Sequence, residues 1–266
     1  MTIMTTEEPA AQDRPSGPAP GPGPDDGARD DGAREDGARR SWARRWAGAV
    51  VDWVRHAPGT YLWLLILGAN TFALVRMSPR FRKYFLITHS TNLLELGRHP
   101  IKVLIASAFW TETPSFLFWF VIFTLFHAPV ERWLGTWRWL AVVAIAHIGA
   151  TLVSEGAVAL LIDANDLPAR TAHTIDIGVS YALSGSVGVL TYFFARPLRW
   201  YYLGGTALFY LFLLAAYQDF TNLGHLTAYL LGLACYPIAR GVPGGDWYPR
   251  AFDRWAPVAR ILGRPG

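Results

Sequence analysis

The chain has 266 residues, of which 52% are hydrophobic and 17% charged. Soluble domains carry about 25% charged residues, so this composition argues against a soluble enzyme. The net charge of +4 divides into −4 over residues 1–40 and +8 over the remainder. The basic residues follow apolar runs and form no single stripe, which disfavours nucleic-acid binding. With only one cysteine, Cys235, the chain has no intrachain disulfide or cysteine-based metal site. An integral membrane protein is therefore expected.

Residues 1–40 are rich in Pro, Gly, Ala, Asp and Arg and have almost no large apolar residue. They contain three near-copies of a five-residue unit: Asp25 to Arg29, Asp30 to Arg34 and Glu35 to Arg39. Such a segment buries too little apolar surface to offset its ordering entropy. We expect a disordered tail, and a partner-binding tail is the less favoured alternative. The segment lacks the apolar region of a signal peptide.

Residues 41–58 mix Trp with Arg: Trp42, Arg44, Arg45, Trp46, Trp53 and Arg55. This mixture is typical of a segment that lies at the membrane interface. Apolar runs follow, each near the roughly 20 residues that a membrane-spanning helix requires. They occupy residues 59–76, 115–130, 138–162, 177–195, 200–217 and 223–239. The predicted fold class is an all-α polytopic membrane protein with about six transmembrane helices. The range of this count is five to seven.

The distribution of Lys and Arg predicts the orientation, because basic residues favour cytoplasmic loops. If the N-terminus is inside, most arginines near helix ends fall on the cytoplasmic side: Arg39, Arg40, Arg44, Arg45, Arg55, Arg132, Arg138, Arg196, Arg199, Arg240, Arg250 and Arg254. The exception is the first loop, 77–114, which carries five basic residues. That loop is long, and long loops weigh less in this rule. Both termini, including the tail 241–266, are expected in the cytoplasm.

Two polar groups begin the fourth and sixth apolar runs. They are Gly178-Val179-Ser180-Tyr181 and Gly224-His225. Polar groups within membrane helices are costly, and they often mark functional sites. A serine hydroxyl is a weak nucleophile that needs a base, usually an imidazole, within hydrogen-bonding distance. Ser180 and His225 at matching depths on neighbouring helices would meet this need. Small residues later on both helices would let the backbones approach closely: Gly185, Gly188, Ala228 and Gly232.

These motifs resemble those of the rhomboid family of intramembrane serine proteases. The family's fourth helix opens with Gly-x-Ser-x and has glycines where Gly185 and Gly188 stand here. Its sixth helix has His-x-x-[Gly/Ala]-x-x-x-Gly, matched from His225 to Gly232. Two further segments are similar to the family's pattern: Glu131 to Gly135 after the second run and, more weakly, Pro100 to Trp110 before it.

The resemblance covers roughly residues 59–240 and implies a rhomboid-like helical bundle. It also implies a serine endopeptidase that uses Ser180 and His225 without a metal or organic cofactor. The implied partners are the lipid bilayer and a transmembrane protein substrate. Nucleic acid is not an expected partner.

The second apolar run departs from the family pattern. Rhomboid proteases carry a His and, four residues later, an Asn that stabilise the oxyanion; ungapped counting puts Ser115 and Trp119 at these positions. Trp119 lacks the amide, and Ser115 would be the remaining side-chain donor. Tyr181 stands where the family has Gly and is expected to crowd the site. These departures leave open an alternative: a catalytically inactive rhomboid-like protein that binds or escorts membrane clients.

Ser184 is a rival nucleophile, but only Ser180 has both the preceding Gly178 and the glycine offsets. No His-Glu-x-x-His motif is present, which excludes a zinc protease of that kind.

A second group of polar residues is spaced by four along the third run: His147, Thr151 and Glu155. They would share one helix face, either as a proton or ion path or, as we favour, as polar contacts between helices. His173 and Asp176 precede the fourth run. They would either orient groups at the mouth of the site or, as we favour, form a turn, with Asp176 capping the helix.

Overall fold

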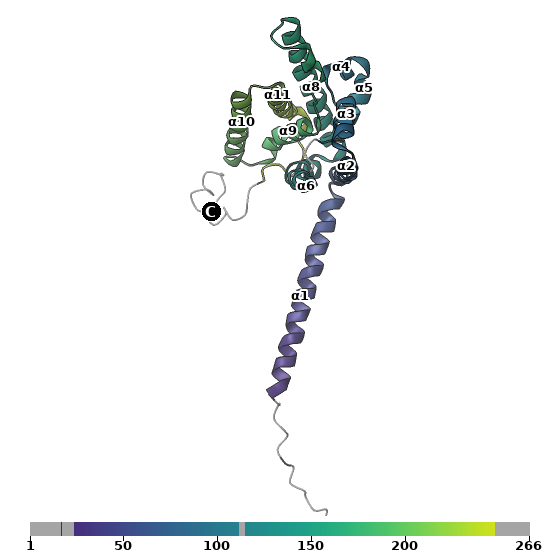
Figure 1. Ribbon diagram of the computed structural model, residues 1–266. Coiled ribbons are helices and arrows are strands. Elements are labelled where there is room, and N and C mark those ends of the chain that lie inside the picture. Colours follow the sequence, from purple (N-terminus) through teal and green to yellow (C-terminus); the bar gives the residue numbers. More distant parts are fainter. Residues whose placement is uncertain (1–16, 18–23, 112–114, 248–266) are drawn as a thin grey trace, which may run out of the picture. The chain divides into compact units, whose positions relative to one another are not determined.

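The computed structural model describes residue 17 and residues 24–111 and 115–247 (Figure 1). No β-strand occurs among these residues, and an isolated bridge joins Phe194 to Trp247. The α-helices are α1 (Pro24–Arg55), α2 (Pro58–Arg76), α3 (Pro79–His89), α4 (Leu93–Arg98), α5 (Pro100–Ser107), α6 (Phe116–Ile122), α7 (Ala128–Leu134), α8 (Thr136–Asp163), α9 (Val179–Leu190), α10 (Leu198–Tyr217), α11 (Phe220–Ala234) and α12 (Tyr236–Ala239). Three short segments of other helix types join them: η1 (Phe123–His127), η2 (Ala169–His173) and η3 (Thr191–Phe193). The chain divides into two units, Met1–Val51 and Asp52–Gly266.

The predicted tail, residues 1–40, overlaps α1, which begins at Pro24; its disorder remains a prediction. Residues 1–16 and 18–23 lie outside the described residues. The repeats place Asp or Glu four residues before Arg, a spacing that favours helix, and Ala and Arg have high helix propensity. Farther along α1, Trp42 and Trp46 are exposed and their rings lie 5.8 Å apart. The interfacial role of residues 41–58 remains a prediction.

Among the described residues, four helical segments are long and apolar enough to cross a membrane: Pro58–Arg76, Phe116–Leu134, Thr136–Asp163 and Leu198–Tyr217. They coincide with four of the six predicted runs. The other two runs also form helices, but α9 and α11 are shorter, with 12 and 15 residues. The first loop folds into α3, α4 and α5.

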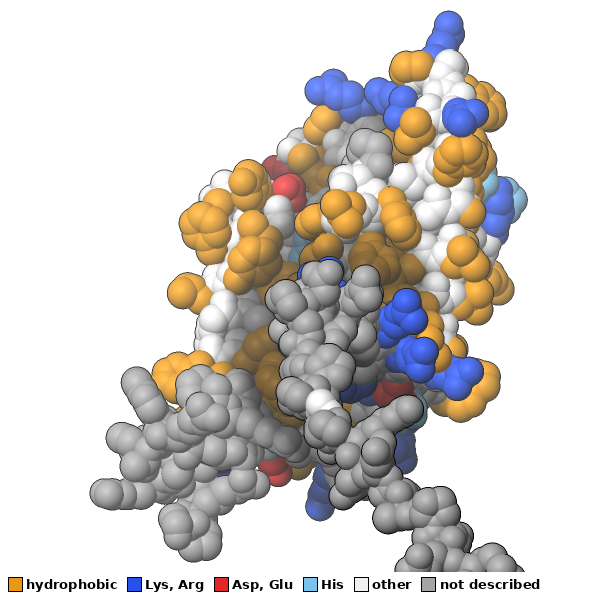
Figure 2. Space-filling view, turned by 90° about the horizontal axis from the view of Figure 1, so that it is seen from below, with side chains coloured by type: hydrophobic (Ala, Val, Ile, Leu, Met, Phe, Trp, Pro, Cys, Tyr) orange, Lys and Arg blue, Asp and Glu red, His pale blue; other side chains and the backbone are white. Residues whose placement is uncertain are grey.

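The outward-facing surface of these helices is apolar. Along α10 only Tyr210 is buried, and large side chains such as Leu208, Phe209 and Phe212 are more than half exposed. Figure 2 shows apolar side chains spread over the face seen from below, with Lys and Arg gathered in separate groups. An apolar surface of this kind suits the hydrocarbon of a bilayer, where each helix satisfies its own backbone hydrogen bonds.

The centre of the second unit is α9, which packs mainly against α8 and α11. Most of its residues are buried, and small residues allow the close approach. A Cβ atom added to Gly185 would collide with Ala146 of α8, and one added to Gly188 would collide with the Tyr229 carbonyl of α11. Gly232 of α11 lies directly against the Gly185 carbonyl, so that backbone meets backbone. The second half of α9 and the C-terminal part of α11 are therefore held at a fixed separation.

The carboxylate of Glu131 in α7 binds the start of α2. It is fully buried and accepts hydrogen bonds from the Gly59 and Thr60 amides at 2.8 and 2.7 Å. It also accepts from the hydroxyls of Thr60 and Thr136, at 2.7 and 2.8 Å. The first amides of a helix have no partner within the helix, so an acidic group is favourable there. Gly135, with φ of 82°, ends α7 in a backbone conformation that favours glycine.

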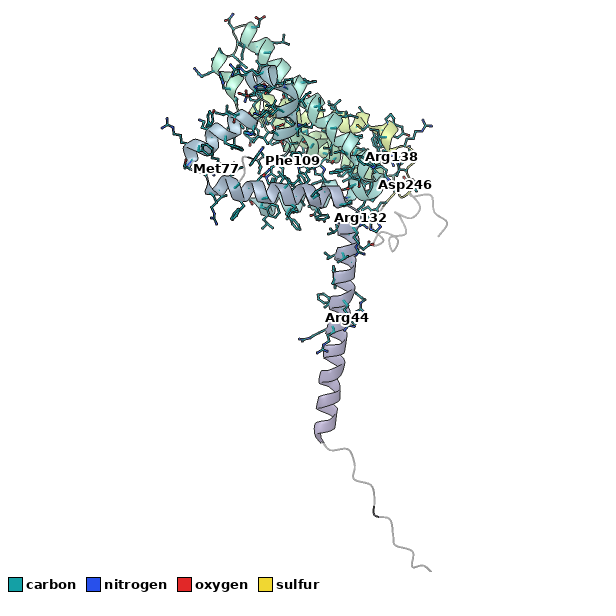
Figure 3. All side chains as sticks on the ribbon, turned by 90° about the vertical axis from the view of Figure 1, so that its right-hand side faces the viewer. Arg44, Met77, Phe109, Arg132, Arg138 and Asp246 are labelled. Carbon is teal, nitrogen blue, oxygen red and sulfur yellow. The ribbon has the colours of Figure 1, made fainter. Side chains whose placement is uncertain are left out.

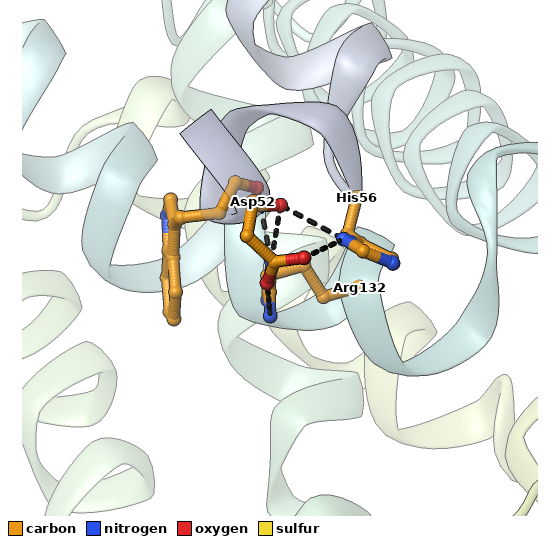
Figure 4. Close-up of polar contacts among 4 residues, drawn as sticks. Asp52, His56 and Arg132 are labelled. Atoms are coloured by element: carbon orange, nitrogen blue, oxygen red, sulfur yellow. Dashed lines mark hydrogen bonds and ion pairs between the residues drawn. The ribbon is translucent and has the colours of Figure 1, made fainter. Parts of the chain in front are cut away.

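Polar residues gather at the end of the second unit where α2 begins. Figure 3 shows Arg132, Arg138 and Asp246 at this end, opposite Met77 at the far end of α2. Arg132 donates hydrogen bonds to the carbonyls of Asp52 and Trp53 at 3.2 and 3.0 Å and lies over the Trp53 ring (Figure 4). These contacts attach the start of the second unit to α7.

Candidate active site

Ser180 and His225 are brought together by the helices that carry them. Ser180 lies in the first turn of α9 and His225 in the second turn of α11. The distance from Ser180 Oγ to His225 Nε2 is 2.9 Å, a hydrogen bond. Both side chains are half-buried. A hydroxyl that donates to an imidazole nitrogen is the arrangement in which a serine becomes a nucleophile.

Two further polar residues at the start of α11 orient the imidazole. Asp219 caps α11 by accepting from the Asn222 amide at 2.7 Å and also accepts from Asn222 Nδ2 at 3.0 Å. The bond from Asn222 Nδ2 to Asp219 directs the Asn222 side-chain oxygen toward His225 Nδ1, which is 3.5 Å away. A proton on Nδ1 leaves Nε2 free to accept from Ser180. Neither residue stands out in the apolar pattern of the sequence, although the three-residue spacing from Asp219 to Asn222 is typical of a helix cap.

Tyr181, expected to crowd the site, supports His225 instead. Its fully buried ring lies edge-on to the imidazole, with ring centres 5.3 Å apart. Its hydroxyl donates to Asp176 Oδ1 at 2.8 Å, and the Thr91 hydroxyl donates to the other carboxylate oxygen at 3.3 Å. A Cβ at Gly224 would lie 2.5 Å from the Tyr181 ring, so that glycine makes room for the tyrosine.

The expectation that Asp176 caps α9 is wrong. The N-cap is Gly178, and Asp176 binds Tyr181. A Cβ at Gly178 would collide with the imidazole of His147, which packs against the turn. His147 Nε2 also lies 2.8 Å from the Leu104 carbonyl of α5. These contacts join α8, α5 and the start of α9, as expected for polar contacts between helices. His173, the other residue of this loop, is exposed in η2.

The remaining small residues and the polar face of α8 lie inside the bundle. Ala228 is fully buried in a cluster with Ala146, Ala150 and Tyr181, beside the contact between Gly185 and Gly232. Thr151 and Glu155 are buried on α8.

A cavity of about 250 Å³ opens beside Ser180, and its lining includes Trp119, Thr111 and Asp176. Ser115, the expected oxyanion donor, does not line it. The Ser115 side chain instead caps α6 by accepting from the Phe118 amide at 3.4 Å. The ungapped count placed Ser115 on the second span, but α6 begins only at the next residue.

The two neighbouring serines of α9 have other partners. Ser184 Oγ donates to the Ser180 carbonyl at 3.0 Å, within the helix. Ser186 Oγ lies 2.9 Å from His127 Nδ1, a second serine–histidine contact, but both residues are fully buried. Of the three serines, Ser180 is the one that lines the cavity.

Helices long enough to span a bilayer, an apolar outer surface and a buried polar centre define a polytopic membrane protein. The model of the rhomboid-like protein family matches residues 52–245, and the chain belongs to this family. The match confirms the resemblance and the all-α polytopic fold that the sequence predicts. Comparison with curated proteins and with solved structures found no match to this chain.

Proposed function

We propose that this protein is an intramembrane serine endopeptidase in which Ser180 is the nucleophile and His225 the base. The observation that carries the proposal is the 2.9 Å hydrogen bond between Ser180 Oγ and His225 Nε2 beside a cavity. The substrate class is a transmembrane protein, as the family resemblance implies. No cofactor takes part in this reaction.

The chemistry proceeds through an acyl-enzyme. Ser180 Oγ attacks the carbonyl carbon of the scissile peptide bond while its proton passes to His225 Nε2. The resulting imidazolium donates that proton to the departing amine as the C–N bond breaks. A water molecule then gives a proton to Nε2 and attacks the ester carbonyl. Collapse of the second tetrahedral intermediate releases the carboxylic acid and returns the proton to Ser180.

Hydrolysis within a bilayer needs a path for water, and the length of α9 favours one. Its 12 residues span about 18 Å at 1.5 Å per residue, against about 30 Å of hydrocarbon. One end of α9 is therefore recessed from a membrane surface. The polar lining of the cavity at the α9 start, from Thr111, Asp176 and Ser180, suits water there.

The second candidate function is a catalytically inactive rhomboid-like protein that binds membrane clients. The observation that favours it is the bulky Trp119 in the lining of the Ser180 cavity. In this case Ser180 and His225 contribute only to packing.

Fluorophosphonate labelling of the purified protein separates the two candidates. The endopeptidase predicts covalent labelling that is lost in Ser180→Ala and in His225→Ala. The matched control is Ser186→Ala, which removes a serine with an equally short histidine contact and should keep the label. Absence of labelling in the folded wild type supports the inactive protein. Labelling that survives Ser180→Ala but disappears in Ser184→Ala or Ser186→Ala contradicts our assignment of the nucleophile.

We also propose that the protein lies in the cell membrane with both termini in the cytoplasm. Arg132 and Arg138 at the α2-start end of the bundle support this orientation (Figure 3). Reporter fusions at residue 45 and after residue 245 should both report cytoplasm. Opposite locations would mean an odd number of spans.

A further inference from the structure

We propose that a cavity at the α2-start end of the second unit binds one phospholipid whose headgroup carries both a phosphate and a primary ammonium. The cavity has a volume of about 500 Å³ and shares no lining residue with the cavity beside Ser180. Ligand sites commonly have volumes of about 300–1,000 Å³ and combine apolar walls with a few polar groups. The proposal does not depend on the endopeptidase function.

The cavity extends from the polar end of the unit toward its apolar middle. Arg132 lies near the C-terminal end of the membrane-spanning segment Phe116–Leu134, and Leu125 lies in the middle of that segment. Seven residues separate the two, about 10 Å along a helix. Leu125 is 58% exposed on the apolar outer surface, so a molecule in the bilayer can reach the cavity from the side. A ligand with a polar head and an apolar chain fits this gradient.

Aromatic rings form much of the apolar wall. Phe193 packs against Trp133 with ring centres 5.5 Å apart and stacks on Trp247 with centres 5.9 Å apart. The Trp247 amide donates to the Phe193 carbonyl and the Ala195 amide donates to the Trp247 carbonyl, both at 2.9 Å. These bonds hold Trp247 against η3, so the wall is formed before a ligand binds and little ordering is required. Trp side chains are also common at the depth of lipid headgroups.

Arg132 supplies a fixed guanidinium at the polar side of the cavity (Figure 4). Its Nη1 donates to the carbonyls of Asp52 and Trp53, and the guanidinium carbon lies 4.4 Å from the centre of the Trp53 ring. Within the described residues, Arg132 Nε and Nη2 donate no hydrogen bond. Arginine binds phosphate through two parallel N–H···O bonds. Phosphate is therefore the group that we assign to Arg132.

Asp52 adds a negative charge beside this guanidinium. Its Oδ2 lies 3.6 Å from Arg132 Nη2, which is longer than a hydrogen bond, and its Oδ1 lies 3.2 Å from His56 Nδ1. The Asp52 side chain is 60% exposed and can accept from a further donor. A purely anionic headgroup would be repelled by Asp52, and a purely cationic one by Arg132. Phosphatidylethanolamine has a phosphate and a primary ammonium two carbons apart, which places an opposite charge beside each residue.

The test is binding of single phospholipids to the full-length protein, purified in detergent, by native mass spectrometry. The probes are dioleoyl phosphatidylethanolamine, phosphatidylcholine and phosphatidylglycerol. We expect phosphatidylethanolamine to bind about tenfold more tightly than phosphatidylcholine, because a trimethylated ammonium cannot donate a hydrogen bond to Asp52. Phosphatidylglycerol should also bind more weakly than phosphatidylethanolamine, since it has no cation for this carboxylate.

Two substitutions test the headgroup contacts. Arg132→Ala should weaken binding of all three lipids by about 10- to 100-fold, because each of them carries the phosphate. Asp52→Asn should bring phosphatidylethanolamine and phosphatidylcholine within about twofold of each other, because the amide has no charge for the ammonium. The matched controls are Arg138→Ala and Asp246→Asn, at the same end of the unit but outside the lining, and both should bind like the wild type (Figure 3). If Arg132→Ala lowers the melting temperature, the exposed Asp52 variant carries the test.

A third substitution, Leu125→Trp, tests the apolar part of the cavity by filling it. It should weaken binding of phosphatidylethanolamine about tenfold. The matched control is Leu208→Trp on α10, where the leucine is also more than half exposed but lies outside the lining. This control should bind like the wild type. The pair therefore separates a lipid held in the cavity from lipid on the outer surface.

Several results overturn the inference. Wild-type protein that binds phosphatidylethanolamine no more tightly than phosphatidylcholine has no site for the ammonium. Tighter binding of phosphatidylglycerol makes the site one for anionic lipids. A folded Arg132→Ala or Leu125→Trp protein that binds like the wild type places the lipid elsewhere. Binding that appears only after deletion of residues 248–266 makes that segment the occupant of the cavity.

Discussion

Among single side chains, Glu131 joins segments that lie far apart in the sequence. Its carboxylate accepts from residues 59 and 60 in α2 as well as from Thr136 at the start of α8. Glu131→Ala would leave the two buried donors of Thr60 without an acceptor, at about 1–3 kcal/mol each, and would free the partly buried Gly59 amide and Thr136 hydroxyl at a smaller cost. We expect a loss of about 3–5 kcal/mol in the free energy of unfolding and a clear fall in the melting temperature in detergent. Glu131→Gln, which keeps one carbonyl oxygen, should lose less. A Glu131→Ala protein that melts like the wild type would contradict this role.

In the proposed reaction, Asn222 acts through the orientation of His225. Its contact with Nδ1 is long, at 3.5 Å, so its loss should cost no more than an ordinary hydrogen bond, about 0.5–1.5 kcal/mol. Asn222→Ala is therefore expected to slow labelling of Ser180 about 2- to 10-fold without changing the melting temperature. The measurement is the labelling rate of Asn222→Ala beside that of wild type. An unchanged rate would show that the contacts with Tyr181 and Ser180 hold the histidine without Asn222.

The sequence could predict the contact between Ser180 and His225, because both begin apolar helices at the same depth and small residues follow each of them. It could not predict the partners of Glu131, since these depend on contacts that span about 70 residues. For the same reason it could not show that Ser115 caps α6 and lies outside the lining of the Ser180 cavity. A residue count gives the position along a helix, but not which groups line a cavity.

At the scale of helices, the contact between α9 and α11 has no spare volume. A Cβ at Gly232 would collide with the Gly185 carbonyl, a backbone group that cannot move aside. Gly232→Ala should therefore destabilise the protein by about 1–3 kcal/mol, and Gly232→Leu should prevent folding. The matched control is Gly205→Leu on α10, where a Cβ meets nothing within 4 Å. The measurement is the melting temperature in detergent of the Gly232 variants and of the Gly205→Leu control. A Gly232→Leu protein with normal expression and melting would contradict the contact.

Helix ends were harder to predict than helix positions. The run 177–195 becomes only a short α-helix, because α9 begins after Gly178 and turns into the 3-10 segment η3 at Thr191. The first loop contains helix-start signals that hydropathy does not reveal. Ser78 and Asn92 cap α3 and α4, and prolines begin α3 and α5. Caps and prolines mark where helices start even where hydropathy shows no span.

At the scale of the whole molecule, the chain divides between Val51 and Asp52, and the family match begins at that boundary. Deletion of residues 2–38 is expected to leave the melting temperature within error, because this segment has almost no large apolar side chain to dock. Thermal melting of the two purified proteins in the same detergent is the measurement. A fall of several degrees would show that the tail contributes to the folded core.

The direct backbone contact between Gly185 and Gly232 has a consequence for inactivation by heat. Many enzymes lose activity well below their melting temperature, because a mobile catalytic segment loosens first. Here the proposed nucleophile and the proposed base stand on two helices that cannot separate unless the centre of the bundle opens. Loss of Ser180 labelling and loss of helical signal should therefore follow one curve during heating. Inactivation several degrees before melting would place the weak point outside this helix pair, in the α11 cap or in the loop that carries Asp176.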